Sequence, residues 1–321
     1  MDTGNHYDTI VIGGGPAGLT AGIYLSRARV RTLILNEGVA GGQMVLTHEI
    51  ANYPGVETIS GYQLSAIMKK QAISFGCTIK SNISVRSVDL AGEIKKIELQ
   101  DGSAYTSHTV VLAPGGRPRT LGVPGEEDLR GKGISYCATC DGDFFTGKDI
   151  IVVGGGNSAL EEAVSLTKYA KKVTVVHQFD HFQAFEYAVR EAEENPAISF
   201  LMETTIDSFE GKEKMESVLL RNLRNGEITR FKTDGAFIFI GYVPNTEFLR
   251  GIVQMNSSGE IIVDEQMETN LKGVYAAGDS IVKKYRQVTT AVGDGTIAAL
   301  AASACINEMK SKKKQTAFGY N

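Results

Sequence analysis

The sequence predicts an α/β protein of two domains, because one short pattern of strand, glycine-rich turn and helix occurs twice along the chain. The first copy begins at residue 7 and the second at residue 148. The first glycines of the two turns, Gly13 and Gly154, are 141 residues apart. A length of 321 residues also favours two domains, since single hydrophobic cores stop growing at about 250–300 residues.

The composition is ordinary for a globular protein, apart from its many glycines. Apolar residues make up 42% and charged residues 22% of the chain, and 36 glycines stand against 7 prolines. Glycine lets a backbone approach a ligand closely, as nucleotide-binding loops require. A net charge of −4 argues against a nucleic-acid-binding surface. The amino terminus has no basic segment leading into a long apolar one, so we expect a cytoplasmic protein without a membrane span.

The first copy predicts a dinucleotide-binding turn. An apolar strand over residues 7–12 runs into Gly13-x-Gly15-x-x-Gly18, and residues 19–29 have the pattern of a helix. Such glycines allow a tight turn and close approach of a pyrophosphate, which the N–H groups of the helix start then bind. A second strand over residues 31–35 ends near Glu37, at the spacing where a carboxylate bonds an adenosine ribose.

The second copy has the same order of elements. A strand over residues 148–153 leads into Gly154-x-Gly156-x-x-Ala159 and a helix that ends near Leu166. Two such units in one chain commonly serve one flavin and one nicotinamide nucleotide. The predicted fold class is therefore α/β, with two Rossmann-like nucleotide-binding domains of three-layer ββα type.

Two Gly/Pro-rich stretches indicate how the domains are connected. Residues 114–118 follow one buried-looking strand and residues 241–244 follow another. If both are crossings, residues 118–244 form a domain inserted into a first domain made of residues 1–117 and 245–321.

A pair of cysteines supplies the most specific chemical feature. Cys137 and Cys140 are two residues apart, and Asp141 follows at once. In a cytoplasmic chain such a pair is typical of redox chemistry or metal binding rather than a structural staple. A zinc site needs two more ligands, whereas Cys77 and Cys305 lie in separate apolar stretches typical of core residues, so the pattern favours a redox dithiol.

A third glycine element lies near the carboxyl end. Residues 273–277 have the pattern of an apolar strand, Gly278 and Asp279 follow it, and residues 289–304 form a small-residue helix pattern. A carboxylate at this place can bond a ribityl hydroxyl, with the helix start beneath a flavin ring, although a plain strand-turn-helix has the same pattern.

Taken in order along the chain, these motifs resemble those of the low-molecular-weight bacterial thioredoxin reductases. The likeness covers nearly the whole chain, and its most specific part is Cys137-Ala-Thr-Cys-Asp141. The other matching stretches are Gly13-Gly-Gly-Pro-Ala-Gly18, Gly41-Gly42-Gln43, Asn52-Tyr-Pro54-Gly55, Gly154-Gly-Gly-Asn-Ser-Ala159 with Glu161-Glu162, and Gly278-Asp279 with Tyr285-Arg286-Gln287.

The resemblance implies an FAD-containing homodimer in which the inserted domain is pyridine-nucleotide-like and carries the dithiol. Cys140 then faces the flavin, Cys137 attacks the disulfide of thioredoxin, and Asp141 acts as acid and base. The domains rotate to bring the dithiol alternately to the flavin and to the substrate. The positions expected to contact FAD are Gly13, Gly15, Pro16, Ala17, Gly18, Asn36, Glu37, Gly41, Gly42, Gln43, Asn52, Gly278, Asp279, Arg286, Gln287 and Val288.

One stretch departs from the family pattern. Members that use NADPH carry a His-Arg-Arg run and a further Arg that bind the 2′-phosphate, whereas this chain has Gln178, Phe179 and Gln183 at those positions and adds Asp180. Two interpretations follow. One is a switch to NADH, or weak use of NADPH; the other is loss of nicotinamide use, as in the ferredoxin-dependent flavin thioredoxin reductases, which the chain resembles most.

We therefore expect a thioredoxin-disulfide reductase with FAD as cofactor, thioredoxin as partner and reduced ferredoxin as donor. A flavin and dithiol redox sensor without steady turnover is the alternative of a different class. The basic tail, residues 310–314, is typical of a solvated helix end and is a weaker candidate for attracting an acidic ferredoxin. Phe318 and Tyr320 are candidates to cover an exposed flavin face.

Overall fold

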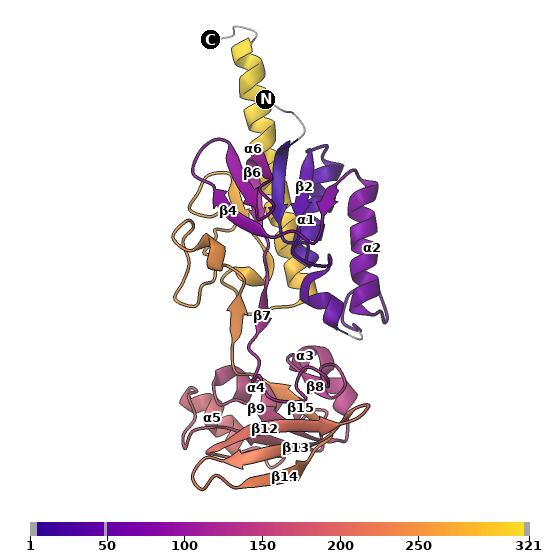
Figure 1. Ribbon diagram of the computed structural model, residues 1–321, viewed down its shortest axis with the longest axis vertical. Coiled ribbons are helices and arrows are strands. Elements are labelled where there is room, and N and C mark those ends of the chain that lie inside the picture. Colours follow the sequence, from indigo (N-terminus) through magenta and orange to yellow (C-terminus); the bar gives the residue numbers. More distant parts are fainter. Residues whose placement is uncertain (1–4, 48–49, 318–321) are drawn as a thin grey trace. The chain divides into compact units, whose positions relative to one another are not determined.

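The computed structural model describes residues 5–47 and 50–317, with side chains up to residue 312. Phe318 and Tyr320 therefore lie outside the described residues. The chain divides into two compact units, unit 1 made of Met1–Arg117 with Val243–Asn321 and unit 2 made of Pro118–Tyr242. Two short strands, β7 (Gly116–Pro118) and β16 (Tyr242–Pro244), pair where the chain passes between the units (Figure 1).

Unit 1 is built on a mainly parallel sheet. Parallel strands run in the order β3-β2-β1-β6, and β17 pairs with the second half of β6, while β5 and β4 add an antiparallel pair on its first half. The strands are β1 (His6–Ile12), β2 (Thr32–Leu35), β3 (Thr78–Lys80), β4 (Val85–Asp89), β5 (Lys95–Leu99), β6 (Ala104–Leu112) and β17 (Val274–Ala276). The helices are α1 (Pro16–Arg27), η1 (Gly42–Leu46), α2 (Gly61–Ser74), η3 (Glu247–Leu249), η4 (Gly278–Ser280) and α6 (Val288–Ala317).

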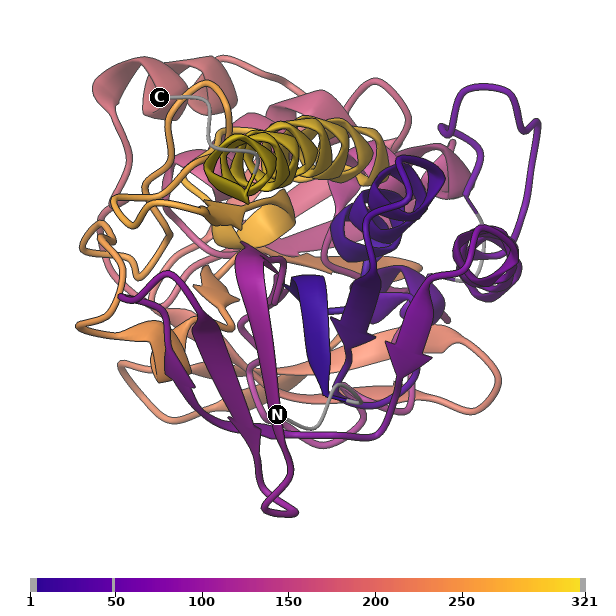
Figure 2. The ribbon, with the colours of Figure 1, turned by 90° about the horizontal axis from the view of Figure 1, so that it is seen from above.

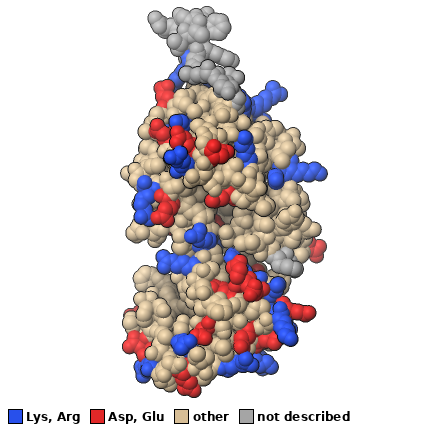
Figure 3. Space-filling model, viewed as in Figure 1, with Lys and Arg blue, Asp and Glu red and all other residues tan. Residues whose placement is uncertain are grey.

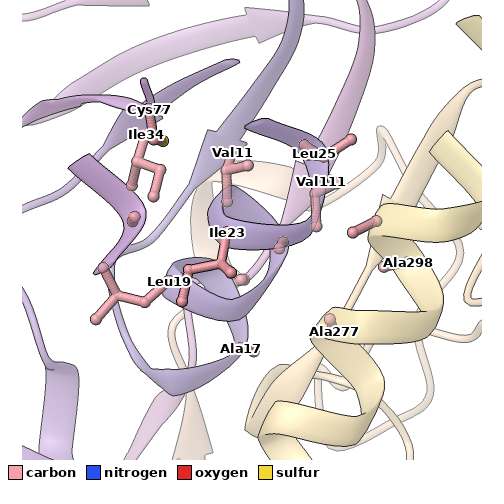
Figure 4. Packing of buried hydrophobic residues seen from close by; sticks show 14 of the residues in the cluster. Val11, Ala17, Leu19, Ile23, Leu25, Ile34, Cys77, Val111, Ala277 and Ala298 are labelled. Carbon is pink, nitrogen blue, oxygen red and sulfur yellow. The ribbon is translucent and has the colours of Figure 1, made fainter. Parts of the chain in front are cut away.

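The central strands of unit 1 are apolar on both faces, because both faces are covered. Ile10, Val11 and Val111 are fully buried. Figure 2 shows α1 and α6 side by side over one face of these strands. Figure 4 shows Leu19, Ile23 and Leu25 of α1 packed against that face and Ala298 of α6 near it.

The helix α6 extends beyond the small-residue pattern of residues 289–304 and includes the basic tail, residues 310–314, which the sequence predicts as a helix end. It continues past Ala304 to Ala317, because the lysine-rich stretch that follows consists of good helix formers. Residues Val288–Lys312 are long and apolar enough to cross a membrane by length and composition alone. A core helix meets the same criterion, and Ala298, Ala302 and Ile306 are buried in the core of unit 1.

Unit 2 has three layers. Its parallel sheet runs β11-β10-β9-β15-β8, an antiparallel sheet β12-β13-β14 forms a second layer, and helices form the third (Figure 1). The strands are β8 (Ile134–Ser135), β9 (Asp149–Val153), β10 (Lys172–Val176), β11 (Ile198–Leu201), β12 (Thr204–Gly211), β13 (Met215–Asn222), β14 (Ile228–Lys232) and β15 (Gly235–Ile238). The helices are α3 (Ala138–Asp141), η2 (Gly142–Phe145), α4 (Asn157–Leu166) and α5 (Glu186–Glu193).

Two apolar clusters hold these layers together. Val152 and Val175 pack with Ala163 of α4, whereas Ile151 and Val176 pack with the antiparallel sheet. The alternation of partners along each strand is that of a parallel sheet covered on both sides. The predicted fold class, α/β with Rossmann-like units, is confirmed.

Charged side chains are interspersed on the surface. Figure 3 shows Lys and Arg among Asp and Glu on the visible face of each unit. This mixture agrees with the net charge of −4.

Candidate functional site

The dithiol lies at the start of a single helical turn in unit 2. Cys137 and Cys140 form a disulfide, with their Cα atoms 5.3 Å apart. Cys137 is the N-cap of α3, and its sulfur accepts the backbone N–H of Cys140 at 3.2 Å. Both cysteines are half-buried. A backbone N–H directed at a sulfur atom favours negative charge on it.

The carboxyl group of Asp141 is joined to the strand before the dithiol. Ser135 Oγ donates to Asp141 Oδ2 at 2.6 Å. Burial raises the pKa of Asp141, and the neighbouring Asp143 raises it further, while the bond from Ser135 acts in the opposite direction. A carboxyl group with a raised pKa beside a disulfide is suited to donate and accept a proton.

The first glycine turn, in unit 1, leaves no room for a Cβ at Gly13, Gly14 or Gly18. Gly13 has a φ of +109°, and a Cβ there would lie 2.0 Å from the carbonyl oxygen of Ala113. A Cβ on Gly18 would lie 1.9 Å from the carbonyl oxygen of Gly13. Asn36, just after β2, accepts the N–H of Gly14 at 2.8 Å. These contacts hold the backbone against the start of α1, where N–H groups are available to a phosphate.

A second glycine pair, Gly41 and Gly42, lies against this turn. Gly41 N–H donates to the carbonyl of Gly14 at 2.7 Å. A Cβ on Gly42 would lie 3.1 Å from the Cα of Gly15. The pair continues into Gln43, which is exposed. Two backbones this close form a cradle that a larger residue at either position would fill.

The turn η4, which precedes α6, supplies the third part of the predicted flavin site. Oδ1 of Asp279 is buried and has no hydrogen-bond partner among the described residues. Burial raises the pKa of Asp279, although Lys283 and Arg286 lower it in part. A buried carboxylate oxygen without a donor is the feature expected of a group that binds a hydroxyl, such as one of a ribityl chain.

Other charges fix the position of this turn. Asp294 of α6 accepts the N–H of Gly278 at 3.2 Å and pairs with Lys283. Arg286 pairs with Glu260, and both are largely buried. The bond from Gly278 to Asp294 ties the Gly278–Asp279 turn to α6.

The predicted FAD positions, all in unit 1, fall into groups. Gly13, Gly15, Pro16, Ala17, Gly18, Asn36, Gly41 and Gly42 surround the start of α1, and a Cβ on Gly278 would lie 2.9 Å from that of Ala17. Asn52 and Gln287, just before Val288, form a separate pair, with Nδ2 donating to Oε1 at 3.4 Å. Glu37 is exposed and accepts from Ser84 at 3.1 Å. The glycine cradle and the unpaired oxygen of Asp279 fit the phosphates and ribityl chain of FAD.

The second glycine turn, in unit 2, repeats the first with different side chains. Gly155 and His177 correspond by their spacing of 141 residues to Gly14 and Asn36. The His177 ring lies against Gly155, where a Cβ would be 2.3 Å from Nδ1. Gln183 N–H donates to the carbonyl of Gly155 at 2.8 Å, as Gly41 does in unit 1.

Aromatic side chains gather beside this second turn. The His177 ring is buried, stacks on Phe182 at 5.7 Å between centroids, and meets Phe179 edge-on at 5.4 Å. Burial lowers the pKa of His177, because it disfavours the charged imidazolium form. Asp180 pairs with His181 at 2.7 Å.

A cation also lies near the loop. Arg224, from the turn after β13, pairs with Glu203. Glu203, and to a smaller extent Asp180, raises the pKa of Arg224 by stabilising its charged form. Within residues 5–47 and 50–317, no group of three His, Cys, Asp or Glu side chains is arranged to hold a metal.

Sequence reasoning missed several residues that build these sites. Ser135, Glu260, Lys283 and Asp294 were not singled out, because their contacts depend on segments distant in the chain or on a strand end. One signal was available for Asp294: it is the only charged residue between Arg286 and Glu308.

Comparison with known proteins decides the family. The model of the family "Pyridine nucleotide-disulphide oxidoreductase" matches residues 7–295. The chain belongs to this family. A pyridine nucleotide-disulphide oxidoreductase joins, by its name, a nucleotide site and a disulfide, and unit 2 contains both a disulfide and a dinucleotide-type glycine turn.

Individual members of the family are similar over nearly their whole length. A thioredoxin reductase from Peptoclostridium acidaminophilum is 44% identical over 305 residues, covering 93% of this chain and 96% of the relative. A "34.2 kDa protein in rubredoxin operon" from Clostridium pasteurianum is 43% identical over 295 residues, covering 92% and 96%. The crystal structure of thioredoxin reductase from Streptococcus pyogenes matches with a TM-score of 0.92 at 39% identity, covering 95% of this chain and 100% of that one.

Proposed function

We propose that this protein is an FAD-dependent reductase of thioredoxin disulfides, with reduced ferredoxin as electron donor. The proposed reductase activity rests on the half-buried Cys137–Cys140 disulfide with the carboxyl group of Asp141 beside it. The similarity to thioredoxin reductases over more than nine tenths of the chain supports thioredoxin as the acceptor.

Unit 1 is proposed as the FAD domain and unit 2 as the domain that carries the dithiol. FAD when bound supplies an electron pair to the disulfide. The glycines around the start of α1 exclude side chains from the pyrophosphate, and Asp279 offers its unpaired oxygen to a ribityl hydroxyl. We also propose a homodimer in the cytoplasm.

Three residues of this chain, Cys137, Cys140 and Asp141, take part in the proposed dithiol reaction. The thiolate of Cys137 attacks one sulfur of the thioredoxin disulfide, and the bond between the two thioredoxin sulfurs breaks. The leaving sulfur takes a proton from Asp141. Cys140 gives its proton to Asp141 and attacks Cys137, so that the Cys137–Cys140 bond re-forms as the mixed disulfide between Cys137 and thioredoxin breaks. The second thioredoxin sulfur leaves as a thiolate and takes the proton from Asp141, which releases reduced thioredoxin.

The proposal of ferredoxin as electron donor rests on the loop after β10. The three positions at which NADPH users carry arginine hold Gln178, Phe179 and Gln183. The His177 ring and its aromatic neighbours pack beside Gly155, and the nearby Arg224 is engaged with Glu203. A relative encoded in a rubredoxin operon is consistent with electrons that come from an iron protein.

NADH is the second candidate donor, favoured by a specific observation. Gly154 keeps a φ of +139° and Gly156 precedes α4 without a side chain, so the turn retains the shape that receives a pyrophosphate. NADH needs no cation for a 2′-phosphate.

One experiment separates the donors. The purified flavoprotein is mixed with thioredoxin and offered NADPH, NADH or photoreduced ferredoxin in turn, while flavin absorbance and thiol release are followed. We expect rapid bleaching and thiol release with ferredoxin alone. Rapid bleaching by micromolar NADPH or NADH would overturn the donor assignment, and bleaching without thiol release would favour the redox sensor.

Substitution of each cysteine checks the division of roles. Cys140→Ser should stop electron passage from the flavin to thioredoxin. Cys137→Ser should keep a thiol that faces the flavin yet support no turnover, because the attacking sulfur is gone. If Cys137→Ser still reduces thioredoxin, the assigned roles are reversed.

A further inference from the structure

One hydroxyl group links the two ends of the dithiol site. Ser135 Oγ lies 2.6 Å from Asp141 Oδ2. The same oxygen accepts the backbone N–H of Cys137 at 3.1 Å and lies 3.3 Å from the carbonyl of Cys137. Ser135 is 5% exposed, so water does not compete freely for these contacts.

The position of this hydroxyl is set by the sheet rather than by the turn that carries the cysteines. Ser135 is the last residue of β8, which pairs in parallel with β15, and it stands opposite Phe237. Phe237 is fully buried. A side chain on a paired strand over a packed core keeps its place when the short helix α3 changes its geometry.

We propose that Ser135 is a positioning residue for disulfide exchange, holding Asp141 by Oδ2 so that Oδ1 carries the transferred proton. This inference rests on the proposed role of Asp141 as acid and base. It adds a residue outside the Cys-x-x-Cys-Asp motif to the chemistry.

The proton balance explains what the hydroxyl does. When an external thiolate attacks one sulfur of the disulfide, a new S–S bond forms and the Cys137–Cys140 bond breaks. The electron pair remains on the leaving sulfur, which takes the proton from Asp141. The resulting carboxylate keeps the O–H of Ser135 as donor, which stabilises the charged form that burial disfavours.

The charged groups around Asp141 determine the direction in which loss of the Ser135 hydroxyl shifts the pKa of Asp141. Asp143 of η2 raises the pKa of Asp141, together with burial. On α4, which packs against α3, Glu161 accepts from Tyr187 and Glu162 lies half-buried. Loss of the Ser135 hydroxyl removes the interaction that lowers the pKa, so the acid form of Asp141 persists to higher pH.

The test follows reduction of the disulfide by dithiothreitol, which needs neither thioredoxin nor an electron donor. Full-length flavoprotein is quenched with a thiol-alkylating reagent at intervals between pH 5 and pH 9, and rates are divided by the thiolate concentration of dithiothreitol. With Ser135→Ala, the pH at which the rate falls should rise by about one unit, since a hydrogen bond to a charged group is worth about that much. Ser135→Thr, which keeps the hydroxyl, should restore the parent profile.

Two further variants keep the outcomes distinct. Asp141→Asn should abolish the inflection; if it does not, Asp141 is not the acid, and the proposed mechanism fails together with this inference. If Asp141→Asn abolishes the inflection but Ser135→Ala leaves it in place, the role of Ser135 alone is overturned. Should Ser135→Ala be unstable, Ser135→Cys keeps the volume with a weak donor and should shift the inflection in the same direction.

Discussion

The close contact between α1 and α6 predicts opposite effects for two alanine substitutions on one helix. A Cβ on Gly295 would lie 2.2 Å from the carbonyl oxygen of Ala17 and 3.0 Å from its Cα. Two residues earlier, a Cβ on Gly293 would meet open space. Both glycines lie inside α6, so alanine gains the same helix propensity at each.

The magnitudes follow from these two environments. Alanine in place of glycine inside a helix gains about 1 kcal/mol, so Gly293→Ala should stabilise unit 1 by up to that amount. At residue 295, overpacking costs about 1–3 kcal/mol, and the upper end applies because a backbone carbonyl cannot rotate away. Gly295→Ala should therefore destabilise unit 1 by about 2 kcal/mol, about 3 kcal/mol below Gly293→Ala.

Urea unfolding followed by circular dichroism measures this difference. The parent and both variants are compared at equal flavin content and equal protein concentration. The free energy of unfolding is obtained from the midpoint of each transition and the slope of its dependence on urea. A Gly295→Ala protein as stable as the Gly293→Ala protein would refute the close helix contact.

Two other substitutions test buried carboxylates. Burial raises the pKa of Asp279 in the native flavin-free protein. Between the pKa of Asp279 in the unfolded chain and its pKa in the native protein, the native carboxyl is protonated while the unfolded one is not. The free energy of unfolding therefore falls as the pH rises through this range. Asp279→Asn should remove that fall, stabilise the flavin-free protein at pH 7 in thermal unfolding, and weaken FAD binding in a fluorescence titration; unchanged FAD affinity would exclude the proposed contact. Glu126, which is 3% exposed, accepts from the N–H groups of Leu121 and Gly122 and from Tyr136 Oη. Glu126→Gln should destabilise unit 2 by about 1–3 kcal/mol in urea, since its amide leaves a buried donor unpaired, whereas the exposed control Glu127→Gln should change little; equal stability of the two variants would contradict this account.

Local patterns predicted the parts of the protein whose partners lie nearby in the chain. The turns that begin at Gly13 and Gly154 were predictable because their glycines are needed by the backbone itself, through positive φ and close approach. Cys137 and Cys140 were predictable as a pair because a spacing of three places both sulfurs on one helical turn.

Contacts between distant segments required the folded chain. Three features depend on which strand ends meet at one edge of the sheet. They are the bond from the N–H of Gly14 to Asn36, the unpaired oxygen of Asp279, and the bond from the N–H of Gly278 to Asp294. The small-residue pattern of residues 289–304 covers only part of α6, because helix propensity continues through the lysines that follow it.

The sequence by itself determined the α/β class, the two glycine turns and the pairing of Cys137 with Cys140, because each follows from backbone sterics or from residues a few positions apart. Only the tertiary structure decided which side chains complete the sites. Ser135 reaches Asp141 from a paired strand, and the His177 ring rests on Gly155 where unit 1 has an amide. The physical reason is that hydrogen bonds and burial depend on distances in space, which the order of residues specifies only after the sheets have formed.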